Sequence, residues 1–483
     1  MNKIRDNPAI ETLFFMTYFL FQSITYREAR KVGKIEEGKK GFLSGEKKYL
    51  KDLNIAVICD ELTYVNFSRE CHLYALTPNN WKQVLEDYQI DLFLCESAWE
   101  GRKRDHQCWR GRIYKNHFVK FETRKVLFDI LDACRKRKIP TVFWNKEDPT
   151  YFGNPRYDFV DTALHFQYIF TTAQECVKKY QELGHKQTNV LMFGFSPDFY
   201  NPKGSGIKEK KAVFAGSWFG EDKGRCAMES ALFDKVINEN IPLEIYDRQS
   251  GSRKKNRQYP QKYQRFVHQA VGQEALGEIV KKSLYALNIN TVMCSETMFA
   301  RRVYELMASN VYIISGASSA MSKWLKGRYS QVGDPLPHNV EEICRDNVNY
   351  VFQNHTNKQR LTDMLNKIGY PVKQEKISVA VCSSKYDYGC YQEGKISVYT
   401  VKSMDEISTD FQYFIIWENE KLPQLEKMAV HFDYLTEDCG VRISKNHFYQ
   451  TVEDDDNVGV LFPVGMLKLI HSGTAVKTKK YQI

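Results

Sequence analysis

Short apolar runs alternate with amphipathic segments along most of the chain, and this alternation predicts the fold class. Strand-like runs in the first part lie at 54–60, 91–96, 139–145, 168–171 and 190–193. Before the third run, Phe121–Lys138 has apolar residues at helical spacing and a basic last turn that suits the helix dipole. Buried strands that alternate with helices are typical of a parallel sheet covered on both faces.

The alternation restarts after a polar, turn-rich segment at 201–206, which we interpret as an interdomain linker. The expected strands lie at 212–215, 243–246, 284–287 and 311–314, and the expected helices at 298–309, 340–354 and 357–368. Open α/β sheets bind ligands outside the carboxyl ends of their strands. We therefore expect two Rossmann-like domains whose strand ends face one another across a cleft.

A third, smaller α/β unit follows. Its expected strands lie at 377–382, 395–401, 411–417 and 458–462, with a helix near 423–435. The predicted organisation is a helical segment at 1–50, a Rossmann-like domain at 51–202, a second at 207–372 and an accessory α/β domain at 373–483. A length of 483 residues suits several domains, since single cores rarely exceed roughly 250–300 residues.

Composition and charge narrow the function classes. A hydrophobic content of 43% and an aromatic content of 13% can support packed cores, which excludes a disordered chain. The net charge of +10 is spread along the chain and suits an anionic membrane face, a phosphate-rich substrate or simply a basic surface. Without a concentrated basic stripe or a nucleic-acid motif, we expect no nucleic-acid partner.

Cysteine usage and the N-terminus bear on localisation. The twelve cysteines form no CxxC pair, and several lie in apolar runs, a pattern of reduced thiols that favours the cytoplasm. The apolar run Leu13–Phe21 is shorter than the about 20 residues that span a bilayer, and no signal-peptide cleavage site follows it. It is interpreted as a helix packed on the protein or as an interfacial helix at the inner face of an anionic membrane.

The segment 287–310 carries the strongest chemical signal. A strand ends in a polar loop, and a helix is expected to begin near Thr297 with Arg301, Arg302 and Glu305 in its first two turns. Exposed amides at a helix N-terminus attract phosphate, and a neighbouring arginine makes charge-assisted contacts to it. Glu305 is placed to accept hydrogen bonds from ribose hydroxyls. The alternative is an ordinary solvated face of arginine and glutamate.

This segment resembles a known family. The residues Leu287–Thr291 and Thr297–Ser309 are similar to the signature of CgeB-like (spore maturation protein) bacterial glycosyltransferases of the GT-B fold. Further similar pieces occur in the same order, at 96–99, 145–149, 169–172, 214–217 and 245–248. The resemblance covers roughly Leu53 to Ile368. It implies transfer of a sugar from a nucleotide-diphosphate sugar, a UDP-sugar above all, to a cell-envelope, teichoic-acid-like, capsular or spore-surface acceptor.

The resemblance also implies a donor site in the second Rossmann-like domain. The backbone at Gly216 and Ser217 would approach the diphosphate, and Arg225 with Arg301 or Arg302 would neutralise it. The residues expected near the nucleotide base or elsewhere in the donor site are Tyr246, Asp247, Arg248 and Asn290.

Glu305 matches the second glutamate of the paired-glutamate motif of many GT-B enzymes, the one that holds the ribose. The first glutamate has no match: Thr297 stands eight positions upstream, and Glu296 is one residue away from that position. An acidic contact to the donor sugar at this point is therefore in doubt.

Glycosyl transfer needs stabilisation of the leaving diphosphate and removal of a proton from the acceptor. Arginines can supply the first, so we expect no cofactor beyond the nucleotide-sugar co-substrate and no divalent metal. For the second, the first domain offers Glu96 at the end of the run Leu92–Cys95 and Asp148 after Trp144. Glu96 is the first candidate and Asp148 the second, and a helix cap or a loop acid is the alternative for each.

The third unit resembles part of a degenerate GT-A module. Glu418 and Glu420 stand where such enzymes carry metal-binding aspartates, and we interpret them as surface acids rather than as a cation site. Two other functions stay open for the whole chain: an alditol-phosphate transferase on the same scaffold, and an inactive GT-B module that binds a polymer or a partner enzyme.

Overall fold

The computed structural model describes residues 47–197, 199–202, 208–252, 254–370 and 372–373, together with the backbone of six C-terminal strands. Inter-residue contacts divide the chain into two units. Unit 1 is Met1–Met192 with Ser295–Met298 and Arg360–Lys373, and unit 2 is Phe193–Cys294, Phe299–Gln359 and Gln374–Ile483. Two short segments of the second predicted domain thus belong by their contacts to unit 1.

Unit 1 is built on a parallel sheet of six strands in the order β2-β1-β3-β4-β5-β6. The strands are β1 (Asn54–Ile58), β2 (His72–Ala75), β3 (Leu92–Glu96), β4 (Thr141–Asn145), β5 (Tyr168–Thr171) and β6 (Thr188–Val190). The strand order reverses between β1 and β3, so a ligand site is expected at their carboxyl ends. The expected strand at 190–193 begins two residues earlier than predicted.

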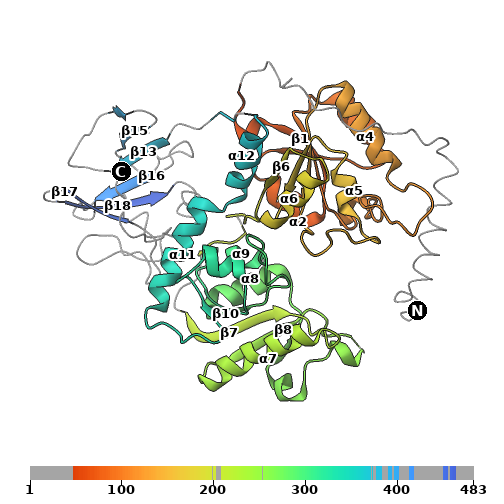
Figure 1. Ribbon diagram of the computed structural model, residues 1–483. Helices are drawn as coiled ribbons and strands as arrows, with labels where there is room; N and C mark the ends of the chain where they lie inside the picture. The colour runs from red at the N-terminus through yellow and green to blue at the C-terminus, as the bar shows by residue number, and fades with distance from the viewer. Residues whose placement is uncertain are drawn as a thin grey trace. The chain divides into compact units, whose positions relative to one another are not determined.

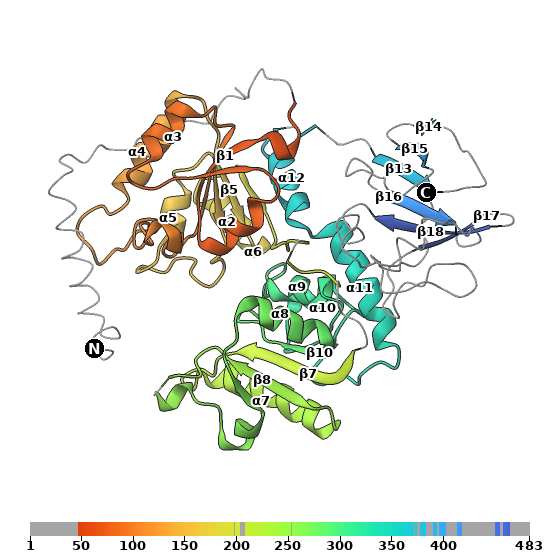
Figure 2. The ribbon, with the colours of Figure 1, turned by 180° about the vertical axis from the view of Figure 1, so that it is seen from behind.

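Helices cover both sides of this sheet. They are α2 (Glu61–Phe67), α3 (Trp81–Asp87), α4 (Lys125–Lys136), α5 (Phe159–Ala163), α6 (Gln174–Glu182) and the second half of α12 (Asn357–Lys367). In Figures 1 and 2, α4 lies on one side of β1 and α12 on the other. The apolar residues that predicted α4, among them Leu127, Ile130 and Leu131, are buried against the sheet.

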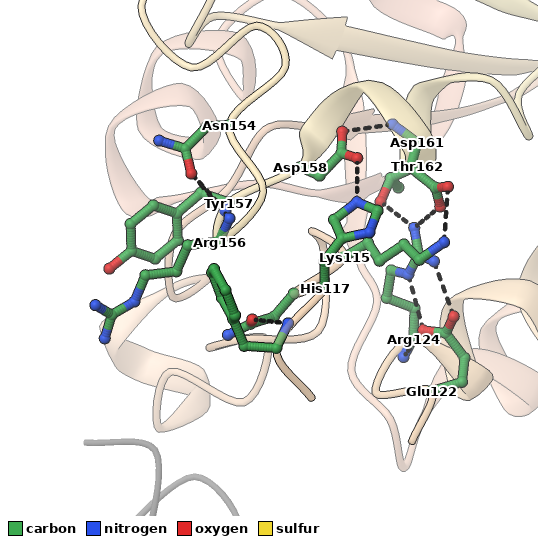
Figure 3. A network of polar contacts seen from close by, with 12 residues as sticks. Lys115, His117, Glu122, Arg124, Asn154, Arg156, Tyr157, Asp158, Asp161 and Thr162 are labelled. Carbon is green, nitrogen blue, oxygen red and sulfur yellow. Dashed lines mark hydrogen bonds and ion pairs between the residues drawn. The ribbon is translucent and has the colours of Figure 1, made fainter. Parts of the chain in front are cut away.

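The predicted helix Phe121–Lys138 is shorter in the structure because Arg124 holds the preceding residues in another conformation (Figure 3). Arg124 is buried, and its Nε and Nη2 donate to the Glu122 carboxylate at 2.8 Å. Its Nη1 donates to Thr162 Oγ1 at 2.7 Å and lies 2.7 Å from Asp161 Oδ1. The guanidinium therefore joins the segment before α4 to α5.

The same connection is fixed at a second point. The backbones of Lys115 and Asp158 exchange two hydrogen bonds, of 3.0 and 2.9 Å, and His117 Nε2 lies 2.7 Å from Asp158 Oδ2. The ammonium of Lys115 donates to Asp161 at 3.2 Å. These polar contacts anchor the long connection between β3 and α4 to the start of α5 (Figure 3).

Unit 2 contains a second parallel sheet of six strands, in the order β12-β11-β10-β7-β8-β9. The strands are β7 (Glu209–Gly216), β8 (Leu243–Asp247), β9 (Val267–Gln269), β10 (Ser283–Asn288), β11 (Tyr312–Ser315) and β12 (Ser330–Gln331). Counted from β7 as the first strand, this is the 3-2-1-4-5-6 order of dinucleotide-binding folds. Its switch point lies between β7 and β10.

The helices of unit 2 are α7 (Lys223–Asn238), α8 (Gln273–Lys282), α9 (Arg302–Ala308), α10 (Ser319–Trp324), α11 (Val340–Asn354) and the start of α12. Figures 1 and 2 show α7 on one side of β7 and β8, and α8 and α9 on the other. The two sheets confirm the predicted α/β class with two Rossmann-like domains, the components of the GT-B fold. The prediction of α11 is confirmed at both ends.

The C-terminal strands form a mixed sheet in the order β14-β15-β13-β16-β18-β17. They are β13 (Ile377–Cys382), β14 (Cys390–Glu393), β15 (Ile396–Val401), β16 (Tyr413–Trp417), β17 (Gln450–Asp454) and β18 (Asn457–Pro463). The four strands expected from the sequence are among them. The expected helix near 423–435, Glu418, Glu420 and the N-terminal run Leu13–Phe21 lie outside the described residues.

Within the described parts of the chain, no helix combines the length and the apolar character needed to cross a bilayer.

Candidate functional site

The carboxyl end of β7 lies at the switch point of unit 2, and at its last residue, Gly216, a neighbouring ring occupies the space of a side chain. A Cβ atom on Gly216 would lie 2.4 Å from the ring of Phe214, and Phe214 is buried in the core. The carbonyl of Gly216 accepts the backbone N–H of Arg248 at 2.9 Å, which ties β7 to the end of β8. The next residue, Ser217, is also buried. The structure therefore brings Gly216, Ser217 and Arg248, three of the residues expected in the donor site, together at the end of β7.

Arg302 reaches the same point from α9. Its Nη1 donates a hydrogen bond to the carbonyl of Ala215, the residue before Gly216. Burial lowers the pKa of Arg302 from its usual value, and the positive charge of Arg248 lowers it further. Among the described residues, no carboxylate forms an ion pair with Arg302 or Arg248. Two guanidinium groups thus lie together at the carboxyl ends of β7 and β8 without an ion-pair partner among the described residues, which favours an anionic ligand.

The start of α9 differs from the prediction. The helix begins at Arg302 and not near Thr297. The residues before Arg302 make other hydrogen bonds, which involve the side chains of Thr297 and Asn290. Thr297 Oγ1 donates to the Thr172 carbonyl at 2.7 Å and accepts the Gln174 N–H at 2.9 Å, both within unit 1. The Asn290 carboxamide accepts the N–H of Ala300 at 2.9 Å.

These contacts engage backbone N–H groups just before the start of α9, at Met298 and Ala300. The N–H groups of Val303 and Tyr304 also donate, to the carbonyls of Ala300 and Arg301. The expected phosphate contact to this helix N-terminus stays a prediction, and the side chain of Arg302 is a further group there that attracts an anion. Asn290, predicted to bind the donor, is buried and holds this connection together.

Arg301 and Glu305 compensate each other. Arg301 Nε donates to Glu305 Oε1 at 2.9 Å, and the Glu305 side chain is buried. A carboxylate in this ion pair has less capacity for ribose hydroxyls than an unpaired one. The structure thus separates the two neighbouring arginines: Arg301 is neutralised within α9, whereas Arg302 is not.

Arg225 belongs to a further ion pair on α7. Its Nε lies 2.9 Å from Oε1 of Glu229, a fully buried carboxylate one helical turn further along. Burial raises the pKa of Glu229 to about 7, against the opposing effect of Arg225. Sequence reasoning missed Glu229, although the i,i+4 spacing of the two residues is a signal for such a pair.

The remaining predicted donor residues lie at the end of β8. The Tyr246 hydroxyl donates to Glu244 at 2.9 Å, and its ring stacks on His268 with 5.1 Å between centroids. Asp247 is buried and accepts the N–H of Gln249 at 2.8 Å. Of the three consecutive residues from 246 to 248, only Arg248 is exposed. Its positive charge acts on Arg302.

In unit 1, the first predicted catalytic residue lies at the switch point but is inaccessible. Glu96 ends β3 and is fully buried. Its Oε1 accepts the Asp60 N–H at 2.7 Å, and its Oε2 lies 2.6 Å from the ammonium of Lys146. Glu96 therefore joins the carboxyl ends of β1, β3 and β4, and its carboxylate contacts no solvent.

The second predicted catalytic residue, Asp148, is also fully buried. It accepts hydrogen bonds from Asn145 at 2.9 Å, Thr171 at 2.7 Å and Tyr180 at 3.1 Å. Burial raises the pKa of Asp148 to about 7, although the hydroxyl donors favour the ionised form. These contacts connect β4, β5 and α6 through Asp148, so its carboxylate stabilises the packing of these three elements.

A residue between these two is more accessible. Glu147 is half-buried, and the Trp99 side chain hydrogen-bonds to its carboxylate. Burial raises its pKa. The Trp99 ring packs edge-on against Tyr151 and Tyr157, with 5.1 and 5.2 Å between the ring centroids.

The chain was compared with models of protein families and with curated proteins, and neither comparison found a match. Solved structures similar to it include HepE of Anabaena in complex with UDP and glucose, at 14% identity, 65% of this chain, 91% of that chain and a TM-score of 0.40. An alpha-glucosyltransferase in complex with UDP-glucose and DNA is 9% identical over 66% of this chain and 99% of that chain, with a TM-score of 0.41. TarM is 8% identical over 60% and 57%, with a TM-score of 0.37. At these values the similarities identify no family, and the assignment below rests on the residues of this chain.

Proposed function

We propose that this protein is a GT-B glycosyltransferase that transfers a sugar from a nucleotide-diphosphate sugar, with UDP as the nucleotide. The observation that carries the proposal is the pair of guanidinium groups of Arg248 and Arg302 at the carboxyl ends of β7 and β8, which have no ion-pair partner among the described residues. In a sheet with the order of unit 2, nucleotides bind at this switch point.

The chemistry of the arginine pair suits a diphosphate. Guanidinium groups are planar, permanently charged and able to hold phosphate oxygens in bidentate contacts. As the bond between the sugar and the diphosphate breaks, negative charge grows on the leaving phosphate, and fixed cations stabilise it without a metal ion. The diphosphate would lie beside Gly216, because the backbone of this residue ends β7 next to both arginines.

Several predicted residues take supporting roles in this proposal. Arg225 lies near Arg248, since both act electrostatically on Glu229, and it adds a third guanidinium to the donor site. Glu96 and Asp148 are positioning residues of unit 1, because both carboxylates are buried and contact neighbouring elements, Glu96 through Asp60 and Lys146 and Asp148 through Thr171 and Tyr180. The half-buried Glu147 is the carboxylate left to meet an acceptor hydroxyl.

The proposed acceptor is an envelope, teichoic-acid-like, capsular or spore-surface polymer, and the proposed location is the cytoplasm or the inner membrane face. Support comes from the net charge of +10, which suits a polyanionic acceptor, and from the free thiols of the nine cysteines in the described residues.

A thermal-shift panel tests the proposal. The protein is heated with UDP-glucose, UDP-N-acetylglucosamine, UDP-galactose, GDP-mannose or CDP-glycerol, and bound ligand raises the midpoint in proportion to the logarithm of its concentration over Kd. We expect stabilisation by one of the UDP-sugars and its loss in Arg302→Ala. Stabilisation by CDP-glycerol alone would favour an alditol-phosphate transferase. No stabilisation by any compound would favour an inactive binding module.

A further inference from the structure

The carboxylate of Glu229 lies in an unusual environment beneath the arginines of unit 2. It is fully buried, yet neither of its oxygens has a hydrogen-bond partner among the described residues. Arg225 Nε is 2.9 Å from Oε1, at an angle that makes an ion pair without a hydrogen bond. The hydroxyl of Tyr259, which interacts electrostatically with Glu229, is also buried and unpartnered. A buried charge with so few partners lowers the stability of the folded protein, so its presence needs an explanation.

The loop after β7 packs against the segment that contains Arg257, near Glu229. The guanidinium groups of Arg225 and Arg257 lie over the Phe219 ring, at 5.3 and 4.3 Å from its centroid. The N–H of Gly220 donates to the carbonyl of Asn256 at 2.8 Å, and a Cβ on Gly220 would lie 3.0 Å from that oxygen. The loop after β7 is thus held against the segment before Tyr259, and Glu229 lies inside.

The titratable groups near Glu229 come from three elements. On its own helix and helix cap these are Arg225, Asp222 and the neutral thiol of Cys226, and at the end of β8 it is Arg248. From the segment after β8 comes Tyr259, whose pKa is raised by burial and by the negative charge of Glu229, so that it stays neutral. The cations that favour ionised Glu229 are therefore Arg225 and Arg248, the same groups that we assign to the diphosphate.

We propose that Glu229 is a positioning residue for Arg225 and that it takes up a proton when a diphosphate binds to the arginine cluster. This inference rests on the proposed function. An empty cluster leaves Arg225 and Arg248 to stabilise the buried carboxylate. A bound diphosphate neutralises them, and the carboxylate becomes more favourable in its protonated form. Since burial already raises the pKa of Glu229 to about 7, this exchange falls in the physiological range.

By linkage, proton uptake makes donor affinity depend on pH. The affinity increases as pH falls, by at most tenfold per pH unit for one group. UDP-glucose is a suitable probe, because each of its phosphates has one ester and one anhydride bond, so that its single acidic oxygen stays ionised near neutral pH. The pH dependence of its binding therefore reports on the protein.

The experiment is isothermal titration of UDP-glucose into the full chain at pH 7.0 and 8.0, in two buffers with different heats of ionisation. For the wild type we expect a binding heat that depends on the buffer, a fraction of a proton taken up, and a several-fold tighter Kd at pH 7.0. Glu229→Gln should bind with no proton uptake and the same Kd at both pH values. Arg225→Gln should also lose the uptake, because its Glu229 already holds a proton.

Glu239→Gln is the matched control, since it makes the same change at the far end of α7, where Glu239 pairs with Lys235. It should behave as the wild type. Proton uptake that persists in Glu229→Gln, or a wild type that binds without uptake, overturns the inference and leaves the proposed function intact. A wild type that does not bind UDP-glucose at either pH counts against both.

Discussion

The side chain of Arg302 donates a hydrogen bond to the carbonyl of Ala215, and so the first residue of α9 is fixed to the carboxyl end of β7. The bond holds the guanidinium beside Arg248 although the two positive charges repel each other. The preceding residue, Arg301, makes no such contact and pairs with Glu305 instead.

This difference predicts unequal effects at two neighbouring positions. Arg302→Ala should weaken UDP-sugar binding by tens of fold, since a charge-assisted contact contributes about 1.5–3 kcal/mol. Arg301→Ala should change the Kd by less than threefold and lower the thermal midpoint, because Glu305 stays buried without its partner. Titration calorimetry and thermal unfolding of both variants measure this. Equal losses of affinity would contradict the assignment.

Asp148 predicts a pH dependence of stability. Its pKa is about 7 in the folded protein and near 3.8 when exposed, so the folded state binds the extra proton between these values. The contribution of Asp148 is therefore fully present below pH 4 and is lost as pH rises through 7, by at most about 4 kcal/mol. In Asp148→Asn this part of the pH dependence should be absent. Denaturant unfolding at pH 5 and pH 8 compares the two proteins, and parallel curves would refute the prediction.

Arg124 should matter for folding and not for donor binding. Arg124→Met removes a buried guanidinium that satisfies Glu122, Asp161 and Thr162 (Figure 3). The two carboxylates keep partial contact with solvent, so we expect a loss of about 2–3 kcal/mol in the free energy of unfolding, below the range for a fully buried pair. Arg135→Met, at an exposed pair on α4, is the control and should cost less than about 1 kcal/mol.

Glu96 and Lys146 form a test of a buried ion pair. Glu96→Gln leaves the largely buried ammonium of Lys146 without its anion, and we expect a loss of about 3 kcal/mol. The double variant Glu96→Gln with Lys146→Met should recover part of this loss, since no isolated charge remains. If the double variant loses more free energy of unfolding than the two single variants together, the pair has another role.

The interior strands of the two parallel sheets were predictable from the sequence, whereas three of their four edge strands were missed. Strands β3, β4 and β5 are buried on both faces and form continuous apolar runs. The missed strands β2, β9 and β12 lie at sheet edges and have partly exposed residues, so their sequences show no apolar run.

For the site, local spacing predicted which residues gather at the end of β7 but not how charges pair. Neighbouring positions such as Arg301 and Arg302 look equivalent in sequence, and only the tertiary contacts with Glu305 and Ala215 separate them. The start of α9 was missed for a similar reason. It depends on the hydrogen bond between Thr297 and Thr172, which are 125 positions apart.

The assignment of Ser295–Met298 and Arg360–Lys373 to unit 1 has a consequence for dissecting the protein. A fragment that stops in the linker near residue 202 would lack Thr297 and Lys367, leaving the carbonyls of Thr172 and Val190 without their side-chain donors. It would also expose the apolar core that Met298 covers. A protease cut in that linker should accordingly nick the chain without yielding a stable N-terminal half.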